Sequence, residues 1–167
     1  MNVDRRLFLF ALSAPLYAAV PLNVLSAKEA EVVEALCAQI IPSDRPSDKS
    51  IEKSAGAKEA GVLYYIEEQL AGPLARFSDD YHRGVPLLNS FSREQTGKLF
   101  PDLGFAEQTE LLHRIESERG SEVDKFFQLV INHTMQGFYG SPKHGGNKDE
   151  VSWRMLGIED VMEGHKH

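Results

Sequence analysis

The stretch Phe126–Trp153 reads FFQLVINHTMQGFYGSPKHGGNKDEVSW, and it decides the fold of the chain. Its first half carries apolar residues at helical spacing, which predicts an amphipathic helix. Ser121 lies just before this helix and Asp124 follows three positions later, a pattern typical of an N-cap. The helix is expected to end within Gly137–Gly140, because glycine favours a C-cap and Pro142 cannot continue a helix.

The segment that follows this helix is predicted to be a loop of one defined shape. It is rich in glycine, and the aromatic residues Phe138, Tyr139 and Trp153 stand at its two borders. Within it, the run Gly145–Asn147 indicates a positive φ angle or a close approach between two backbone segments. The loop is either a well-packed turn or a surface that meets another molecule.

Three residues near the loop have two interpretations each. His133 is expected on the side of the helix away from the phenylalanines, where it either bonds to a neighbouring loop or contacts a partner chain or substrate channel. Trp153 and Arg154 either close the domain, with Arg154 stacked or paired to a carboxylate, or act as interface anchors. The candidate partner interface comprises His133, Phe138, Tyr139, Pro142, Lys143, His144, Gly145, Gly146, Asn147, Trp153 and Arg154.

Length and composition bound the class of protein. A chain of 167 residues has room for one domain with a hydrophobic core. Its apolar fraction of 42% is ordinary for a globular protein. The formal net charge of -7 and the lack of a basic stripe argue against nucleic acid as a partner.

The N-terminus reads as an export signal. Arg5 and Arg6, followed by Phe8 and Leu9, resemble a twin-arginine signal, and the next residues are nearly uncharged. That pathway generally carries proteins that fold before export. We therefore divide the chain into a signal segment, 1–27, and a helical domain, 28–167. Cleavage near Ala27 fits the small-residue rule only partly, and a signal retained as an anchor is the alternative.

The remaining segments are also predicted to be helical. No run alternates with period two long enough for a strand, so the fold class is a small all-α single-domain helical bundle. The expected elements are a helix from a Ser26-x-x-Glu29 capping box to Pro42, an exposed connection over Pro42–Gly56, a helix over Lys58–Ala71, a helix over Leu74–Leu88 disturbed around Gly84 and Pro86, a short helix capped by Ser92, and a helix over Glu107–Glu118.

No pattern in the chain assigns catalysis, cofactor binding or metal binding to it. There is no dinucleotide-binding or phosphate-binding glycine motif, and no histidine pair has the spacing of a helical zinc site. The pairs Glu67-Glu68 and Asp79-Asp80 are expected on solvated faces. Cys37 is the only cysteine and lies on an apolar helix face. It is either an inert buried thiol or forms an intermolecular disulfide with a partner chain.

The chain resembles the small subunit, subunit 3 or gamma, of the gluconate 2-dehydrogenase family. The resemblance spans roughly 27–157, and its C-terminal motif is the specific part. The sequence departs from the family pattern at Ser141 and His144, which leaves the details of the loop contact open. The motifs are Ile40-Ile41-Pro42-Ser43-Asp44, Ala60-Gly61-Val62 with Ile66 and Gln69-Leu70, His133-Thr134-x-x-Gly137-Phe138-Tyr139-Gly140-x-Pro142-x-x-Gly145-Gly146-Asn147, and Trp153-Arg154-x-x-Gly157.

The resemblance implies a non-catalytic subunit in a periplasmic complex. Its partner would be a large FAD-dependent oxidoreductase of the glucose-methanol-choline type that oxidises a sugar, a glycoside or a sugar acid. A multihaem cytochrome c would form a third subunit. The complex would be attached to the inner membrane through partners or through a retained signal. The small subunit would support the maturation of the large one and its export by the twin-arginine machinery.

Two other functions remain open at the level of sequence. The loop Lys143–Asn147 could reach the mouth of the partner's active site and influence the choice of substrate. Alternatively, the chain could be an independent periplasmic protein that binds its own ligand. The first of these predicts altered turnover in an intact complex, whereas the second predicts a stable monomer that ignores any flavoprotein.

Overall fold

Helix α5, Glu122–Tyr139, is the element around which the other helices pack. The structure is a computed structural model, and it describes residues 22–43 and 54–158. The Ser121 side chain accepts a hydrogen bond from the Asp124 backbone N–H, so the predicted N-cap is confirmed. Phe126, Phe127 and Val130 are buried. The helix continues through Gly137 and ends with Gly140 as its C-cap, within the predicted range.

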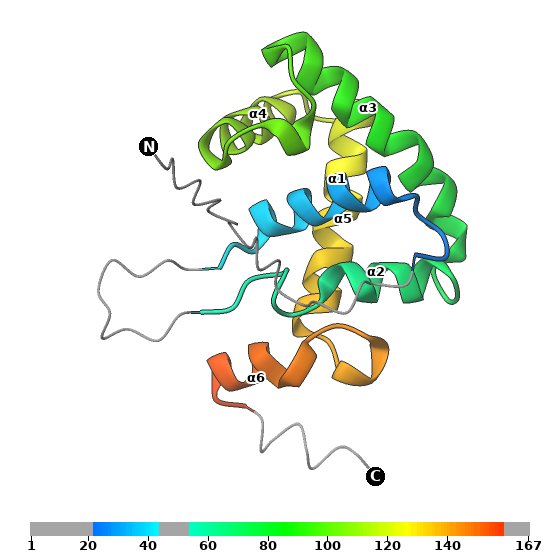
Figure 1. Cartoon of the computed structure of the whole chain (residues 1–167), viewed down its shortest axis with the longest axis vertical. Helices are drawn as coiled ribbons and strands as arrows, with labels where there is room; N and C mark the ends of the chain where they lie inside the picture. The colour runs from blue at the N-terminus through cyan, green and yellow to red at the C-terminus, as the bar shows by residue number, and fades with distance from the viewer. Residues whose placement is uncertain (1–21, 44–53, 159–167) are drawn as a thin grey trace, which may run out of the picture.

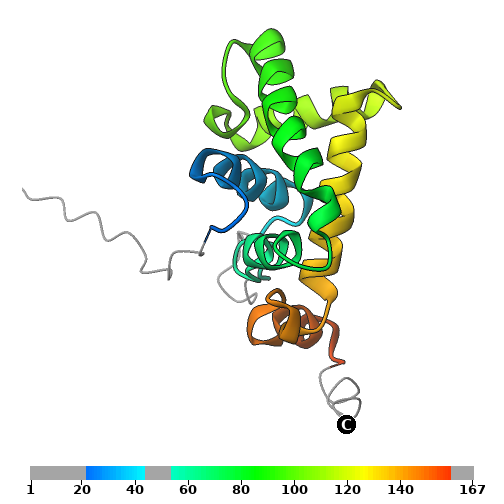
Figure 2. The same cartoon turned by 90° about the vertical axis from the view of Figure 1, so that its right-hand side faces the viewer.

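Four of the five helices that contact α5 pack along its length and bury its apolar residues. They are α1 (Ala27–Ile40), α2 (Val62–Leu70), α3 (Ser78–Thr96) and α4 (Phe105–Ser117). Figure 2 shows that they lie along one side of α5 and leave the opposite side of its C-terminal half without a helix. A sixth helix, α6 (Val151–Leu156), lies beyond the C-terminal end of α5 (Figure 1). Within the described ranges there is no strand, and the all-α prediction is confirmed.

Short 3-10 turns join these helices: η1 (Ala75–Phe77), η2 (Phe100–Asp102), η3 (Pro142–His144) and η4 (Lys148–Glu150). Residues 1–21 of the predicted signal segment lie outside the described residues, as does most of the predicted exposed connection, whereas residues 22–27 are described. The signal residues concerned are Arg5, Arg6, Phe8 and Leu9.

Helix α1 agrees closely with its sequence signals. The Ser26 hydroxyl accepts from the Glu29 N–H, and a Glu29 carboxylate oxygen accepts from the Ser26 N–H, which completes the capping box. Cys37 is buried, and the Thr134 hydroxyl donates to its sulfur at 3.2 Å. Burial raises the pKa of the Cys37 thiol to about 12. The predicted burial of Cys37 is therefore confirmed, and a thiol with a raised pKa forms little of the reactive thiolate.

Helix α2 begins later than predicted. The segment Lys58 to Gly61, predicted to be helical, forms a non-helical turn instead. Gly61 adopts a left-handed conformation with φ +70°, and the Val62 N–H donates to the Ala57 carbonyl at 3.0 Å. Because Ala57 and Ala60 within this turn are buried, the chain enters α2 by a tight, packed turn that helical spacing alone does not reveal.

Helix α3 is continuous, so the predicted disturbance at Gly84 and Pro86 is wrong. Proline lacks the N–H that would donate to the carbonyl four residues earlier in an α-helix. Pro86 lies on the exposed face of α3, where water can bond to that carbonyl instead. The buried face of α3 holds Tyr81, Gly84, Val85, Leu88 and Ser92 at helical spacing. Tertiary packing of this face holds a helix that local propensity alone would break.

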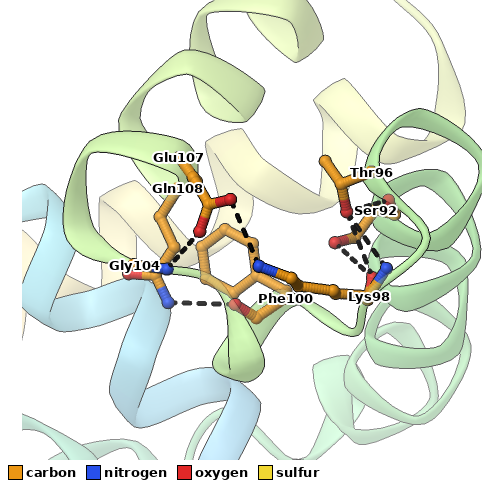
Figure 3. A network of polar contacts seen from close by, with 7 residues as sticks. All are labelled: Ser92, Thr96, Lys98, Phe100, Gly104, Glu107 and Gln108. Carbon is orange, nitrogen blue, oxygen red and sulfur yellow. Dashed lines mark hydrogen bonds and ion pairs between the residues drawn. The ribbon is translucent and has the colours of Figure 1, made fainter.

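The predicted short helix capped by Ser92 is also wrong, because Ser92 lies inside α3. Its buried hydroxyl donates to the Lys98 carbonyl at 2.9 Å and fixes the connection that follows α3 (Figure 3). Further along the connection, the Gln108 amide donates to the Phe100 carbonyl at 2.9 Å, and Glu107 pairs with Lys98. This polar network ties the end of α3 and the start of α4 to the connection between them, and the Ser92 hydroxyl serves this connection instead of a helix start.

Glu67 was expected on a solvated face, and this prediction is wrong. Glu68 is exposed, but the Glu67 side chain is only 1% exposed. Its carboxylate accepts backbone hydrogen bonds from Asn23, Val24 and Leu25, which precede α1. A buried carboxylate must be satisfied by donors, and here the donors come from a distant segment that sequence spacing cannot identify.

Candidate functional site

The loop between α5 and α6 has one tightly specified path. Gly145 has φ +96° and Asn147 has φ +45°, which confirms the predicted positive φ angles. The predicted close approach is also present, at Gly146. A Cβ atom on Gly146 would lie 2.1 Å from the carbonyl oxygen of Gly137 in α5. Only glycine allows the loop to touch the helix backbone in this way.

Two side chains bond the carbonyl groups that α5 leaves free at its C-terminal end. The Trp153 indole N–H donates to the Tyr139 carbonyl at 3.0 Å, and the Asn147 amide donates to the Gly140 carbonyl at 3.0 Å. The Asn147 side-chain oxygen accepts from the Ser152 N–H at 2.9 Å, which ties the loop to α6. Terminal carbonyls of a helix need partners when they are covered, and this loop supplies them.

The loop is also attached to the N-terminal part of the domain. The Lys148 N–H donates to the Ala60 carbonyl at 3.0 Å in the turn before α2. Gly145 packs so closely on Tyr64 of α2 that a Cβ atom would lie 2.8 Å from the Tyr64 ring. The motif in Ala60-Gly61-Val62 and the C-terminal loop motif therefore belong to one contact, although they are far apart in the sequence.

The predicted interface residues divide into a buried layer and an exposed layer. Five of them are buried in the described chain: His133, Phe138, Gly146, Asn147 and Trp153. Pro142 and Gly145 are half-buried, whereas Tyr139, Lys143, His144 and Arg154 are exposed. The buried members make the loop a well-packed turn, and the exposed members are the ones whose side chains another molecule could contact.

The predicted position of His133 is wrong. Its ring lies on the same face of α5 as Phe126 and is 4% exposed. A 3.0 Å hydrogen bond joins its Nδ1 to the hydroxyl of Tyr81 in α3, and the two rings stack. Phe77 meets the His133 ring edge-on, with 5.2 Å between ring centroids. The histidine therefore joins α5 to α3 and η1, and it bonds a helix instead of a loop.

Stability at acid pH should depend on His133. Burial, with a smaller contribution from Arg76, lowers the pKa of this histidine. His133 in the unfolded chain takes up a proton as the pH falls through about 6.5, whereas in the folded chain it does so only at lower pH. The free energy of unfolding should therefore have its full value above that pH and decrease below it. Urea unfolding at pH 7.5 and 5.5 measures the loss. His133→Gln should reduce this decrease in the free energy of unfolding, whereas His113→Gln, at an exposed site, should leave it unchanged. Equal decreases in the wild type and both variants would contradict the role of His133.

Trp153 and Arg154 close the domain. The Trp153 side chain is 3% exposed, so it is not an exposed anchor in the described chain. Arg154 donates to the backbone carbonyl of Asp149, which differs from the predicted stacking or pairing with a carboxylate. This bond holds the last turn before α6, a region where Asp149 and Glu150 both have positive φ angles.

Sequence reasoning missed an uncharged face on α5. Between Lys125 and Lys143 the chain contains no Asp, Glu, Lys or Arg, and this signal could have been read in advance. The exposed residues of α5 in this interval form one face at helical spacing, which we call the α5 outer face: Gln128, Asn132, Met135, Gln136 and Tyr139. These residues are exposed because no other part of the described chain covers their side chains fully.

Exposed apolar side chains gather at this end of the molecule. Among the described residues seven large hydrophobic side chains are exposed, and four of them lie on the C-terminal turns of α5 and on α6. These four are Met135, Tyr139, Met155 and Leu156. Scattered single apolar residues are normal on a protein surface, but a cluster of them near an uncharged face indicates an interaction site.

Other types of site are not evident within the described ranges. No group of histidine, cysteine and carboxylate side chains there could hold a metal ion. Two shallow hollows lie elsewhere, one beside Glu116 and Arg119 and one between α1, α4 and α5, and neither coincides with the loop. No helix in the part of the chain that the structure describes has the length and apolarity to span a membrane.

Comparison with known proteins gives one match. A protein-family model described as gluconate 2-dehydrogenase subunit 3 matches residues 27–159. This range covers α1 to α6 and therefore includes both the helical body and the C-terminal loop. Neither the curated proteins nor the solved structures contain a match to the chain.

Proposed function

The chain belongs to the gluconate 2-dehydrogenase subunit 3 family, and from this premise we propose that it is the non-catalytic small subunit of a periplasmic FAD-dependent sugar, gluconate or glycoside dehydrogenase. Membership of this family implies a multi-subunit complex. We propose further that the chain holds its large catalytic partner, an enzyme of the glucose-methanol-choline type, through the α5 outer face and the neighbouring exposed side chains of α6.

The uncharged character of the α5 outer face carries the proposal. The centres of protein interfaces are depleted in charged residues and enriched in tyrosine and methionine. The α5 outer face has both properties, with Met135 and Tyr139 43% exposed. The exposed surface of α3 and α4 is different, because it carries charged pairs such as Arg83 with Asp80 and Arg114 with Glu110. Of the surfaces that the structure describes, α5 offers the most suitable one for burial.

The C-terminal loop supports this surface. Trp153 and Asn147 fix the backbone at Tyr139 and Gly140, so the end of the α5 outer face has a defined position before binding. A preformed surface loses less conformational freedom on association. A specific interface buries roughly 800 Å² on each partner, so the exposed loop residues Lys143 and His144 and the α6 residues Met155 and Leu156 would extend it beyond one helix face.

Maturation and export are the remaining parts of the proposal. The large subunit would bind FAD, fold together with this chain and leave the cytoplasm through the twin-arginine machinery on the signal of the small subunit. A multihaem cytochrome c would accept the electrons at the membrane. The twin-arginine pattern at Arg5 and Arg6 supports this, together with the family assignment. Binding to the folded small subunit would stabilise the flavin-loaded partner by mass action.

Charge placed on the α5 outer face should abolish assembly. A carboxylate buried in an apolar interface has no partner and costs several kcal/mol, so Met135→Glu or Tyr139→Glu should reduce the recovered catalytic subunit by about tenfold or more. The chain, tagged after His167, is purified from the native host, and the eluate is assayed for flavin absorbance and for a second, larger chain.

Leu87→Glu is the matched control for these variants. Leu87 lies on α3 and is 38% exposed, close to the exposure of Met135 and Tyr139. The Leu87→Glu chain should still co-purify with flavin, and all three variants should keep the wild-type unfolding midpoint. Undiminished flavin in Met135→Glu and Tyr139→Glu would show that the α5 outer face is not the interface. A wild-type eluate that is colourless and contains a single chain would contradict the proposed function itself.

A further inference from the structure

The segment just before α1 is bound to a buried carboxylate. One Glu67 oxygen accepts from the N–H groups of Asn23 at 2.9 Å and Val24 at 3.1 Å, and the other accepts from Leu25 at 2.8 Å. We call this arrangement the Glu67 clamp. Glu67 is 1% exposed and Leu25 is 3% exposed, so the clamp belongs to the core. Consecutive N–H groups that converge on one anion form a strong, specific contact.

The backbone after the clamp is also held by hydrogen bonds. The Ser26 N–H donates to the Glu29 carboxylate, and the Ala30 N–H donates to the Ser26 carbonyl in the first turn of α1. From Asn23 onward the chain therefore passes directly from the clamp into a capped helix. No extended stretch remains there for another protein to bind.

This geometry bears on how the export signal is removed. A leader peptidase hydrolyses a peptide bond, adding water to give a new carboxylate and a new amine, and the segment it cuts must first enter its active site in an open conformation. Bonds in a folded segment are cut only through a transiently opened state, at a rate that falls with the population of that state. A chain that folds before export presents the clamp to the peptidase already closed.

We propose that the Glu67 clamp excludes cleavage between Asn23 and Ala27, so that any removal of the signal occurs before Asn23. The folded domain therefore includes Asn23 and the residues that follow it up to α1. A cut after Ala27 would delete Leu25 from the core and Ser26 from the capping box, and it would leave the Glu67 carboxylate buried without its three donors. The inference rests on the proposed export of a folded chain, but its central test uses this chain alone.

The matched variants are Glu67→Gln and Glu68→Gln. Glutamine at position 67 keeps the size of the side chain but loses the charge, and its amide N–H₂ group cannot accept a hydrogen bond. Glu68 is the adjacent residue and is exposed, so its substitution changes the net charge equally without touching the clamp. Subtilisin is added to each purified full-length chain under native conditions, and the cut sites are identified by intact mass.

The wild-type chain and Glu68→Gln should resist cutting between Asn23 and Ala27, and Glu67→Gln should be cut there about tenfold faster or more. Equal rates in all three chains would overturn the role of Glu67. Should Glu67→Gln fail to fold, hydrogen exchange in the wild-type chain decides instead: protected N–H groups at Asn23, Val24 and Leu25 support the clamp, and unprotected ones overturn it.

The N-terminus of the exported protein is the second readout. It should lie at or before Asn23 when the periplasmic chain is sequenced, and a chain that begins at Lys28 would overturn the inference. The two proposals fail separately. If the clamp resists protease but no flavoprotein co-purifies, only the proposed function is wrong. If a flavoprotein complex forms around a chain cut at Ala27, only the clamp inference is wrong.

Discussion

Replacing Gly146 by alanine is expected to detach the C-terminal loop from α5 and to expose Trp153. The added Cβ would lie 2.1 Å from the carbonyl oxygen of Gly137 and 2.8 Å from its carbonyl carbon. Both atoms belong to the backbone of a packed helix, so neither can rotate away. The loop must move instead and lose the Asn147 hydrogen bonds, which we expect to cost about 3 kcal/mol of stability.

The chain supplies its own probe for this change. Trp153 is the only tryptophan, and its ring is buried while the loop is docked. The Gly146→Ala protein should therefore show red-shifted tryptophan emission and stronger quenching by acrylamide in native buffer, before denaturant is added. Amide exchange at Ser152 should accelerate as well, because its N–H bonds to Asn147.

Gly72→Ala is the matched control for Gly146→Ala. At Gly72 a Cβ atom would lie 3.4 Å from the nearest atom, the Glu68 carbonyl oxygen, which is an ordinary contact. This variant should keep the wild-type emission and stability. Native emission in Gly146→Ala that matches the wild type would show that the loop accommodates a side chain, and the packed-turn description would then be wrong. Detachment should also weaken partner binding, since Trp153 holds the Tyr139 carbonyl at the end of the α5 outer face.

The parts of the fold that the sequence predicts correctly depend on local interactions. The N-cap at Ser121 and the capping box at Ser26 join residues three positions apart, and the structure contains both. The glycine and asparagine run at Gly145–Asn147 is also local, because positive φ angles select these residue types. Each signal is contained within one turn of chain, and so composition and spacing suffice to find it.

Several incorrect predictions depend on contacts between distant segments. Glu67 looks like half of a solvated acidic pair until Asn23 and Leu25, more than forty residues earlier, supply its donors. His133 looks polar and outward-facing until Tyr81, 52 residues earlier, provides a buried hydrogen bond. Pro86 looks like a helix breaker until the packing of α3 outweighs its local cost. Burial of a polar group cannot be deduced from one sequence without knowing its partner.

The candidate interface predicted from the sequence contains both buried and exposed residues, which the sequence alone did not distinguish. Several residues of the C-terminal motif, including Asn147 and Trp153, are buried supports of the loop. The exposed residues Met135, Met155 and Leu156 were not predicted, because they fall at the unspecified positions of the two C-terminal motifs. For Met135, the charge-free interval along α5 was the available signal. The assignment of this region as a partner interface stays a prediction.

Replacing Gly84 by alanine is expected to destabilise the whole domain. Within a helix, alanine is normally about 1 kcal/mol more favourable than glycine. At Gly84, however, the new Cβ would lie 2.1 Å from Cδ2 and 2.2 Å from Cγ of Phe126. Phe126 is buried and meets Tyr81 edge-on, with 5.7 Å between ring centroids, so it has little room to move. We expect a net loss of about 3 kcal/mol, measured as a lower urea midpoint.

A double-mutant cycle with Phe126→Ala isolates the cause. Once the ring is removed the clash disappears, so Gly84→Ala should change sign and stabilise the Phe126→Ala protein by up to about 1 kcal/mol. All four proteins are compared at one sucrose concentration, because Phe126→Ala alone should cost about 3–5 kcal/mol. Ser90→Ala, on the exposed face of α3, should lie within about 0.5 kcal/mol of the wild type. Additive losses of stability in the cycle would mean that α3 and α5 do not pack through Gly84 and Phe126. The described contact between these two helices would then be wrong.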